Sequence, residues 1–456
     1  MILFKNISKR GPLLVLADLA AVISVIYLGS FFRTGDWNLS LLEFPAYLAA
    51  AGLLPVLFYV FDLYYPYKFF KPGRTFFEIA LSVFMGTLIL AALSYADHSF
   101  ILPRSIFFLT LLPVVPLVFI VRMIYDGLFR SRFLDKRTLI VGTGSLARDL
   151  ILTLDNTPHS GLRLVGAVSS ETKGPVEKEA LGRVQVLGNS SKLATIMAQQ
   201  GVHLVVLALE TDQKNMESRI LTELFRRKVA VTSAVHLLER LTGVIPKPMM
   251  EDSHYILGLM AQVKMRPYLK LKRILDVISA STLLFLLSPI LFAAIIVLAL
   301  SGPHQIFFIQ ERVGLNGASF QLIKLRSMMT LRDGQMAVTR LGKWLRKYRL
   351  DEIPQFVNVL KGDMSLVGPR PEIPFFVKRS LAKIPMYEAV FSVKPGLTGW
   401  AQVKFRYTTS VKDYHEKFRY NLFYLKNMSF TLDMLIIFRT VRVVILGSGQ
   451  GGCHFN

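Results

Sequence analysis

The sequence predicts a membrane protein of mixed α and α/β class, with a helical membrane region followed by two α/β domains. Hydrophobic residues make up 52% of the 456 residues. They are concentrated in runs of about 20 residues, the length that crosses a bilayer core. After the first 130 residues, short β-type segments alternate with segments of helical periodicity, which is typical of α/β domains.

Four apolar runs within residues 1–130 predict a four-helix transmembrane bundle. They cover residues 13–32, 41–64, 76–96 and 106–125. The first run could be a signal peptide, but it lacks a small-residue cleavage site and three more runs follow, so we interpret it as a span. Lys and Arg cluster before the first run, between the second and third, and after the fourth. The positive-inside rule therefore places the N-terminus and everything after the fourth run in the cytoplasm.

Two acidic residues lie within or beside these runs. Asp18 falls inside the first run and Glu43 lies at the edge of the second. Carboxylates in a membrane are costly and often functional, so a functional role is one interpretation. A helix–helix contact or an interfacial position is the other.

Residues 131–250 predict a doubly wound α/β domain that opens with RTLIVGTGSLARDLILTL. Its strand, its GxGxxA turn at Gly142, Gly144 and Ala147, and its helix form a Rossmann-type start. Further strands are expected at residues 162–168, 202–209 and 229–232, and helices near 192–199 and 215–226. The second strand ends without an acidic residue that would hold a ribose. A structural or regulatory domain is therefore favoured over a nucleotide-binding one.

The net charge of +23 is concentrated in the C-terminal part of the chain. From residue 258 onward there are 28 Lys and Arg against 11 Asp and Glu. Such a surface attracts nucleic acid, anionic lipid or phosphorylated substrates. Because the cations are interspersed with long apolar runs, we expect membrane lipid and phosphorylated substrates as partners, and no nucleic acid. A single cysteine, Cys453, excludes an internal disulfide and a cysteine-based zinc site.

The apolar segment 274–300 is long enough to be a fifth span. It contains Ser288 and Pro289 near its middle, however. Proline removes one backbone hydrogen bond, and the serine hydroxyl can bond to the carbonyl that is freed. We therefore predict a helix break at Ser288 and Pro289 and a re-entrant hairpin with both ends in the cytoplasm.

Two C-terminal blocks carry candidate site residues. LDEIPQFVNVLKGDMSLVGPRPE (350–372) contains adjacent carboxylates, Asp351 and Glu352, which repel each other unless cations or a metal neutralise them. An ordinary helix N-terminal turn is the alternative. QERVGLNGASFQLIKLRSM (310–328) predicts a strand hairpin that ends in Lys324 and Arg326, either a phosphate clamp or a solvated basic strand end.

Three further C-terminal features have a lipid, a substrate or a packing interpretation. RLGKWLRKYRL (340–350) predicts an amphipathic helix that lies on anionic lipid. Trp400, followed by Lys404, Arg406 and Tyr407, forms either a lip for a nucleotide base or phosphate, or ordinary packing. Aromatic residues between Tyr414 and Tyr424 are expected in the core or at an interface.

These blocks, together with KPGLTGWAQV (394–403), closely resemble the bacterial sugar transferases that are monotopic polyprenyl-phosphate phosphoglycosyl transferases. The resemblance is dense over residues 262–448, and the N-terminal part resembles the accessory region of the large members. It implies a catalytic α/β domain at 262–456, anchored by the re-entrant helix 274–300. The activity it implies is transfer of a sugar-1-phosphate from a nucleoside diphosphate sugar, expected to be a UDP-sugar, to undecaprenyl phosphate. This reaction initiates exopolysaccharide, capsule or O-antigen synthesis.

The resemblance also implies roles for individual residues. Asp351 would be the nucleophile, and Glu352 its partner and a ligand of Mg²⁺, or alternatively Mn²⁺, held by both carboxylates. Lys324, Arg326 and Arg370 would bind the substrate phosphates. The implied location is the bacterial inner membrane with the catalytic domain facing the cytoplasm, in a homo-oligomer that is most simply a dimer. Since all matched blocks follow Lys264, a chain that starts near Met260 is expected to remain active.

Two other classes of function remain open. A membrane-bound NAD-dependent sugar-nucleotide epimerase or dehydratase has a similar layout, but it requires a YxxxK pair. The segment YNLFY that starts at Tyr420 has no lysine at the fourth position after it. A non-enzymatic scaffold for polysaccharide assembly would have no need of Asp351.

Overall fold

The computed structural model describes most of the chain in two compact units, residues 1–242 and 243–456. The described residues are 10–35, 45–61, 63–64, 72–96, 104–130, 135–157, 160–169, 183–209, 220–222, 224–225, 229–250, 252–264, 267–301, 306–330, 336–405 and 411–445. All structural statements below refer to these residues, and the two units are described separately.

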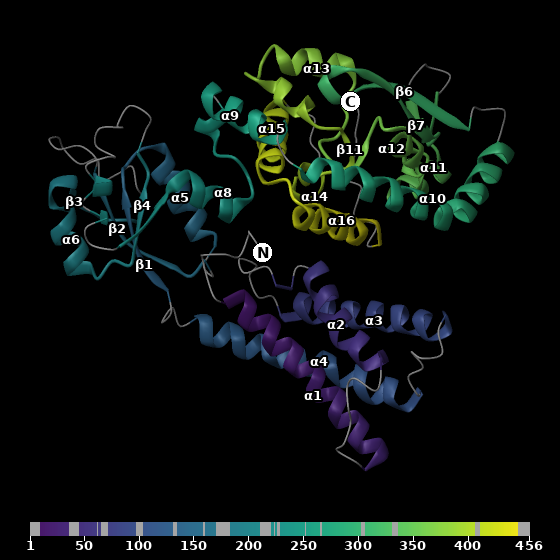
Figure 1. The fold of residues 1–456 in the computed structure, drawn as a ribbon, viewed down its shortest axis with the longest axis horizontal. Coiled ribbons are helices and arrows are strands. Elements are labelled where there is room, and N and C mark those ends of the chain that lie inside the picture. The colour runs from purple at the N-terminus through teal and green to yellow at the C-terminus, as the bar shows by residue number, and fades with distance from the viewer. Residues whose placement is uncertain are drawn as a thin grey trace. The chain divides into compact units, whose positions relative to one another are not determined.

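The first unit begins with helices that coincide with the four predicted apolar runs (Figure 1). They are α1 (Arg10–Thr34), α2 (Pro45–Val60), α3 (Pro72–Ala96) and α4 (Arg104–Arg130). Within the described residues, one of them has a stretch long and apolar enough to cross a membrane, Thr75–Leu93 in α3. The apolar stretches Leu14–Gly29 and Leu48–Tyr59 are shorter. The complete four-helix transmembrane bundle therefore stays a prediction.

Asp18 serves as a helix–helix contact. Arg122 of α4 donates hydrogen bonds to the Asp18 carboxylate of α1 and, at 2.8 Å, to the carbonyl of Leu63, just after α2. Both charged side chains are buried. Removing either partner would leave an uncompensated buried charge, which is strongly destabilising. Glu43 lies outside the described residues.

A five-stranded parallel sheet with the order β3-β2-β1-β4-β5 follows the helices. Its strands are β1 (Lys136–Val141), β2 (Leu162–Ser169), β3 (Val186–Asn189), β4 (Leu204–Leu207) and β5 (Ala230–Ser233). Helices α5 (Ser145–Asp155) and α8 (Ala234–Thr242) form one core with the sheet. Helix α6 (Leu193–Gln200) contributes to a second core.

Neighbouring residues of β1 belong to different cores, Ile140 to the first and Leu139 and Val141 to the second. Since successive strand residues point to opposite faces, the two cores lie on opposite faces of the sheet. This confirms the predicted doubly wound α/β arrangement. Strand β3 was not predicted, and the helix expected at residues 215–226 lies largely outside the described residues.

The first glycine of the GxGxxA turn has a packing role. Gly142 has a φ of +116°, and a Cβ built on it would lie 2.2 Å from the carbonyl oxygen of Ala208, just after β4. The close approach of the two strand ends therefore requires glycine here, whether or not a ligand binds.

The second unit has small sheets surrounded by helices (Figure 1). Its helices are α9 (Ser253–Lys264), α10 (Tyr268–Leu300), α11 (Arg340–Lys347), α12 (Gln355–Lys361), α13 (Pro374–Leu381), α14 (Trp400–Lys404), α15 (Val411–Asn427) and α16 (Phe430–Ile445). Its strands are β6 (Phe307–Val313), β7 (Ser319–Leu325), β8 (Met328–Thr330), β9 (Met336–Val338), β10 (Ser365–Val367) and β11 (Gly396–Thr398). The pairs β6–β7 and β8–β9 are antiparallel, whereas β10–β11 is parallel.

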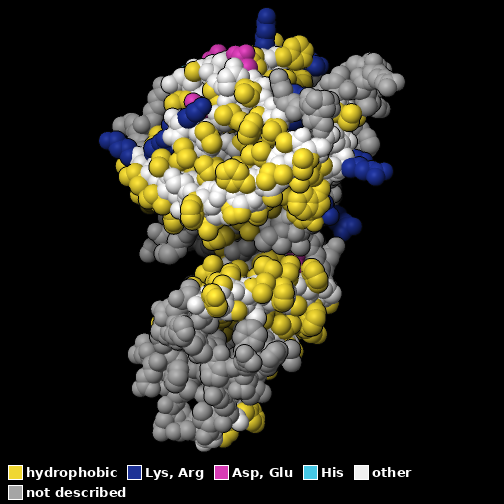
Figure 2. All heavy atoms as spheres, turned by 90° about the vertical axis from the view of Figure 1, so that its right-hand side faces the viewer, with side chains coloured by type: hydrophobic (Ala, Val, Ile, Leu, Met, Phe, Trp, Pro, Cys, Tyr) yellow, Lys and Arg dark blue, Asp and Glu magenta, His cyan; other side chains and the backbone are white. Residues whose placement is uncertain are grey.

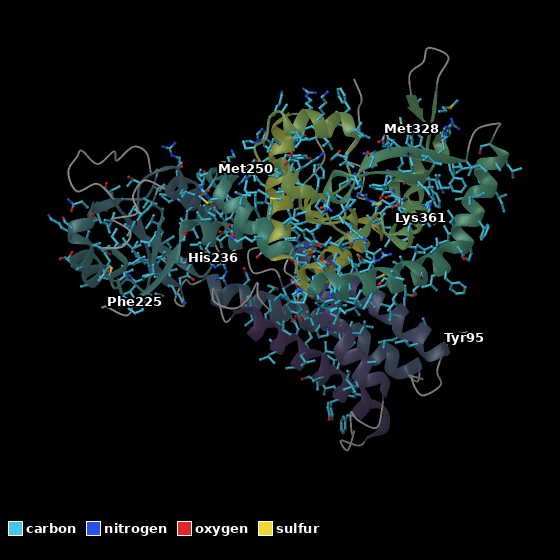
Figure 3. The ribbon with its side chains drawn as sticks, turned by 45° about the horizontal axis from the view of Figure 1, so that its top comes forward. Tyr95, Phe225, His236, Met250, Met328 and Lys361 are labelled. Carbon is cyan, nitrogen blue, oxygen red and sulfur yellow. The ribbon has the colours of Figure 1, made fainter. Side chains whose placement is uncertain are left out.

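The segment 243–264 belongs to this second unit. Trp400 donates its indole N–H to the carbonyl of Gly243 at 2.7 Å, and Arg419 donates to the carbonyl of Ile245 at 2.7 Å. Ile245 and Ile256 are fully buried. Figure 3 labels Met250, which is also buried in this segment. The sequence-based boundaries, which assigned residues up to 250 to the Rossmann-like domain and began the catalytic domain at 262, therefore need correction to Thr242 and Gly243.

Helix α10 has a packed part and an exposed apolar part. Lys272, Asp276 and Ala280, spaced four residues apart, are buried, whereas most side chains from residue 281 onward are exposed. Lys272 pairs with Asp433 of α16, and Asp276 accepts a 3.0 Å hydrogen bond from the backbone N–H of Leu366. Figure 2 views the second unit from the side where α10 lies in Figure 1, and hydrophobic side chains gather on that face.

The backbone of α10 remains helical through Pro289, so the predicted break is a bend within one helix. Figure 1 shows the bent ribbon. The Ser288 hydroxyl donates to the carbonyl of Phe285 at 2.7 Å. This carbonyl is the one that the N–H of a residue at position 289 would bind in a regular helix, and proline has no N–H. The expected serine cap of the freed carbonyl is therefore present.

Candidate active site

The two adjacent carboxylates lie in a short turn between two helices. After α11, Arg349 adopts a left-handed conformation with a φ of +54°, and residues Leu350–Glu352 then form a 3₁₀ turn. The N–H of Glu352 donates to the carbonyl of Arg349 at 3.1 Å. Asp351 is buried, with 8% of its surface exposed. The turn therefore presents two carboxylates from a compact segment rather than from a solvated helix end.

Glu352 lies among three cations. Its Oε1 is 3.8 Å from Lys324 Nζ and 3.6 Å from Arg370 Nη2, and its Oε2 is 3.2 Å from Arg349 Nη1. Burial alone would raise the pKa of Glu352, but the positive charges of Lys324, Arg370 and Arg349 outweigh it and lower the pKa to about 2. Glu352 is therefore ionised at neutral pH.

Asp351 has the opposite electrostatic environment. Burial and the negative charge of Glu352 raise its pKa, and the positive charges of Lys324 and Arg346 only partly oppose this shift. The fold thus separates the proton affinities of two neighbouring carboxylates. Such a separation is typical of acidic pairs that perform different chemical tasks.

Asn358 sets the position of Lys324 relative to this turn. Its Oδ1 accepts a 3.1 Å hydrogen bond from the N–H of Ile323, and its Nδ2 donates to the carbonyl of Gln321 at 2.7 Å. Asn358 is buried in α12, whose last residue, Lys361, is labelled in Figure 3. Because α12 follows Glu352 directly in the chain, these bonds hold the end of β7 beside the carboxylates.

The backbone segment that carries Arg370 is fixed by hydrogen bonds with a second segment, at a point where both contain glycine. Gly368 donates to the carbonyl of Thr398 at 2.9 Å, and Gly396 donates to the carbonyl of Pro369 at 2.8 Å. A Cβ on Gly396 would lie 2.0 Å from Gly368 N, closer than any side chain can approach. The GPRP and KPGLTGW blocks are therefore two halves of one backbone crossing that carries Arg370.

The structure brings together most of the predicted site residues. Asp351, Glu352, Lys324 and Arg370 lie in one cluster. Arg326 lies just after β7, where its N–H donates to the carbonyl of Ile306, and it is not among the described cations paired with Glu352.

Sequence reasoning missed Arg349 and Asn358 as site residues. Arg349 had been grouped with the basic residues of the amphipathic helix, although its position two residues before Asp351 was a usable signal. Nothing local marks Asn358, because its contacts with β7 join segments far apart in the chain.

Trp400 has a packing role. Only 4% of its surface is exposed, and its ring stacks on Phe423 with a centroid distance of 5.7 Å. Together with the hydrogen bond to Gly243, this favours the packing interpretation over a lip for a nucleotide base. Phe418 and Tyr424 are also buried, as expected for a core. Arg406 and Tyr407 lie outside the described residues.

The two carboxylates are too few to form a metal site by themselves, and a metal ion here stays a prediction. Within the described residues, no group of three or more His, Cys, Asp or Glu side chains could hold a metal ion by itself. Mg²⁺ is commonly bound by one or two carboxylates together with substrate phosphates and water, rather than by an all-protein cage. Asp351 and Glu352 supply two carboxylates, the number that such a site requires.

Comparisons with known proteins match two regions of the chain. A family model described as bacterial sugar transferase matches residues 267–447, which contain the carboxylate turn and its cations. A family model described as CoA-binding domain matches residues 59–234.

Several curated proteins are similar to this chain. A UDP-N-acetylgalactosamine-undecaprenyl-phosphate N-acetylgalactosaminephosphotransferase of Aeromonas hydrophila is 42% identical over 191 residues, which cover 40% of this chain and 45% of that protein. A UDP-glucose:undecaprenyl-phosphate glucose-1-phosphate transferase of Caulobacter vibrioides is 40% identical over 37% of this chain and 68% of its own length. A protein of the same name from Escherichia coli is 29% identical over 69% of each chain.

Proposed function

Because the chain belongs to the bacterial sugar transferase family, we propose that it transfers a sugar-1-phosphate from a UDP-sugar to undecaprenyl phosphate. The names of the relatives support both substrates. The observation that carries the proposal is the Asp351–Glu352 pair among Lys324, Arg349 and Arg370 within the matched region. The epimerase or dehydratase alternative has no support in these comparisons. The proposed product, undecaprenyl-diphosphate-sugar, initiates synthesis of a polysaccharide.

The site suggests a two-step displacement. An oxygen of the Asp351 carboxylate attacks the phosphorus that carries the sugar, and the bond to the nucleoside monophosphate breaks. An oxygen of undecaprenyl phosphate then attacks the phosphosugar on Asp351 and releases the carboxylate. The raised pKa of Asp351 favours this role, since nucleophilicity rises with basicity, as it does for thiolates.

The cations beside Glu352 would receive the diphosphate. Lys324 and Arg370 both face Glu352 Oε1, and charge that develops on the phosphoryl oxygens would be stabilised there. A Mg²⁺ or Mn²⁺ held by Asp351 and Glu352 would further neutralise the diphosphate when bound. Arg326, which lies just after β7, stays a predicted phosphate-binding residue.

The surroundings of the site suit a lipid acceptor. Helix α11, which leads directly into the carboxylate turn, exposes 53% of Trp344, while Leu345 is fully buried. Exposed basic residues, Lys343 and Lys347 among them, lie on the same helix. An exposed aromatic ring among cations suits the headgroup level of a membrane.

The transfer itself is tested with purified protein, undecaprenyl phosphate and a panel of radiolabelled UDP-sugars. We expect label from one or a few donors to enter the lipid phase, with release of UMP in equal amount. If no UDP-sugar or other nucleotide sugar delivers label to the lipid, the proposed function is wrong.

Glu352→Gln should weaken metal binding and slow transfer. The amide keeps the size of the side chain but loses the charge that would hold a divalent cation. We expect metal affinity to fall about 10–100-fold, the range that even the outer partners of a metal contribute. Titration of the transfer rate with Mg²⁺ measures this shift. Glu388→Gln, at an exposed position in the same unit, is the matched control and should leave the titration unchanged.

We place the protein in the bacterial inner membrane with both ends of α10 in the cytoplasm. The bend in α10, which contains Pro289, supports a re-entrant helix over a fifth span. The basic residues around the start of α10 favour the cytoplasm for that end. With the catalytic domain in the cytoplasm, Asp351 would meet a cytoplasmic nucleotide sugar. A homodimer stays our proposal for the oligomeric state.

The topology of α10 is tested by cysteine accessibility. In a Cys453→Ser background, Lys270→Cys and Ser301→Cys should both react with reagent only from the cytoplasmic side. Adding Pro289→Leu and Ser288→Ala should straighten the 33-residue helix, whose length of about 50 Å exceeds the hydrocarbon core of about 30 Å. We then expect labelling at position 301 to shift at least partly to the outside. Outside labelling at position 301 in the unmodified helix would show a fifth span.

A further inference from the structure

The two oxygens of Glu352 have different partners. Lys324 and Arg370 both contact Oε1, whereas Oε2 is contacted by Arg349 at 3.2 Å. Arg349 comes from the same short turn as Glu352, and Lys324 and Arg370 come from β7 and from the segment after β10. A metal ion that binds Glu352 through Oε2 must therefore first displace the guanidinium of Arg349.

The backbone at position 349 would favour a different residue. Arg349 follows α11 with a φ of +54°, a left-handed conformation that glycine adopts freely just after helix C-termini and other residues adopt at an energetic cost. The backbone alone thus gives no reason for arginine. The contribution of the residue lies in its side chain, whose described ion pair is with Glu352.

The guanidinium of Arg349 is incompletely bonded in this position. Its Nε is buried and has no hydrogen-bond partner among the residues that the structure describes. Exchange of the carboxylate for phosphate oxygens, which accept several hydrogen bonds from one guanidinium, would satisfy more of its donors.

We propose that Arg349 is a positioning residue that covers Oε2 of Glu352 in the free enzyme and moves to the diphosphate when the metal-bound donor arrives. Its guanidinium would hold the Glu352 side chain in place before the metal binds. It would also make metal binding and donor binding depend on each other, since the donor offers Arg349 a new partner. The proposal rests on the proposed function, but metal binding in the absence of donor tests it separately.

The experiment compares Arg349→Gly and Arg349→Lys with the unmodified full-length protein. Glycine fits the left-handed backbone and removes the guanidinium, while lysine keeps a charge without the planar fork. Met386→Gly is a matched backbone control, because Met386 has a φ of +55° at the start of another 3₁₀ turn of the same unit. Arg379→Ala, which removes an exposed charge from α13, is the charge control.

Two readouts are measured for each variant. Mn²⁺ binding without donor is followed by electron paramagnetic resonance, and transfer kinetics give KM for the donor and kcat separately. For Arg349→Gly we expect Mn²⁺ affinity to rise about three- to tenfold, consistent with the modest strength of one partly exposed ion pair. We expect KM for the donor to rise more than kcat falls. Arg349→Lys should be intermediate, and both controls should behave like the unmodified protein.

Several results would overturn the proposal. They are an unchanged Mn²⁺ affinity in Arg349→Gly, an equal gain in either control, or a loss of kcat without a change in KM. If the protein binds no Mn²⁺, or if Glu352→Gln leaves Mn²⁺ binding unchanged, the proposal is overturned as well. If Mn²⁺ affinity changes as expected but no nucleotide sugar supports transfer, the proposed function fails while the role of Arg349 at the metal site stands.

Discussion

Asp351→Asn should reduce sugar-phosphate transfer by about a thousandfold or more, the usual consequence of removing a catalytic nucleophile. The amide has the shape of the carboxylate but cannot attack phosphorus. Radiolabel from the UDP-sugar should therefore neither enter the lipid nor remain attached to the protein. In the unmodified protein without acceptor, we expect label on the chain and release of UMP.

Asp351→Asn should leave the protein folded and bound to the membrane. The raised pKa of Asp351 means that folding disfavours its charged form. The protonated carboxyl therefore stabilises the fold at low pH, and this contribution is lost as the pH rises through the raised pKa of the folded state. A neutral amide removes the penalty, and thermal stability at neutral pH should be equal or higher. The difference from the unmodified protein should shrink as the pH is lowered.

Asp252→Asn is a suitable control for Asp351→Asn. Asp252 accepts a hydrogen bond from the N–H of Tyr255 at the start of α9, and asparagine caps helices as well as aspartate does. Transfer by this variant should be normal. Activity of more than a few per cent in Asp351→Asn would exclude the nucleophilic role and show that a different group carries out the reaction.

A chain that begins at Gly243 should fold and retain transfer, whereas one that begins at Met260 should not. The longer chain keeps the segment that packs against α15 and Trp400. The shorter chain loses buried Val244, Ile245, Met250 and Ile256. At about 1.5–3 kcal/mol for each buried side chain, the loss is comparable with the whole stability of a typical domain.

Detergent-purified truncations measure this difference. Size-exclusion profiles and thermal unfolding report folding, and lipid labelling reports transfer. The expectation from sequence, that a start near Met260 suffices, changes because the structure assigns residues 243–259 to the catalytic unit. Full activity from the shorter chain would show that the segment is dispensable. Complete inactivity of a folded chain from Gly243 would show instead that the first unit contributes to the reaction.

Local patterns predicted the elements whose cause is local. The alternation around RTLIVGTGSLARDL gave β1, the turn and α5, and the GxGxxA spacing marked a glycine that the close approach to Ala208 requires. The short strand β3 was not predicted, because a run of four residues shows little periodicity. Ser288 and Pro289 predicted the hydroxyl cap, since a proline acts on a carbonyl only four residues away, but the predicted break is a bend within one continuous helix.

The site required contacts that no local pattern contains. Lys324 and Glu352 stood out in local sequence blocks and Arg370 through a family resemblance. Their common position depends on Asn358 and on the backbone hydrogen bonds of Gly368 and Gly396. The boundary at Gly243 likewise depends on a hydrogen bond from Trp400, 157 positions along the chain. Hydrophobicity and spacing do not reveal contacts between residues far apart in the chain. The pattern around Arg349 therefore predicted an amphipathic helix and not the contact of Arg349 with Glu352.

The hydroxyl cap in α10 bears on the order in which the parts of the protein insert into the membrane and fold. A lipid-exposed backbone carbonyl without a partner is costly, and bent membrane helices often rely on a neighbouring helix to supply one. Here Ser288 supplies it from within the same turn, so the bend is complete once residues 285–289 have emerged. On the topology proposed above, α10 would enter the bilayer during translation, before Asp351 and the rest of the second unit exist. That unit would then fold beside a membrane to which it is already attached.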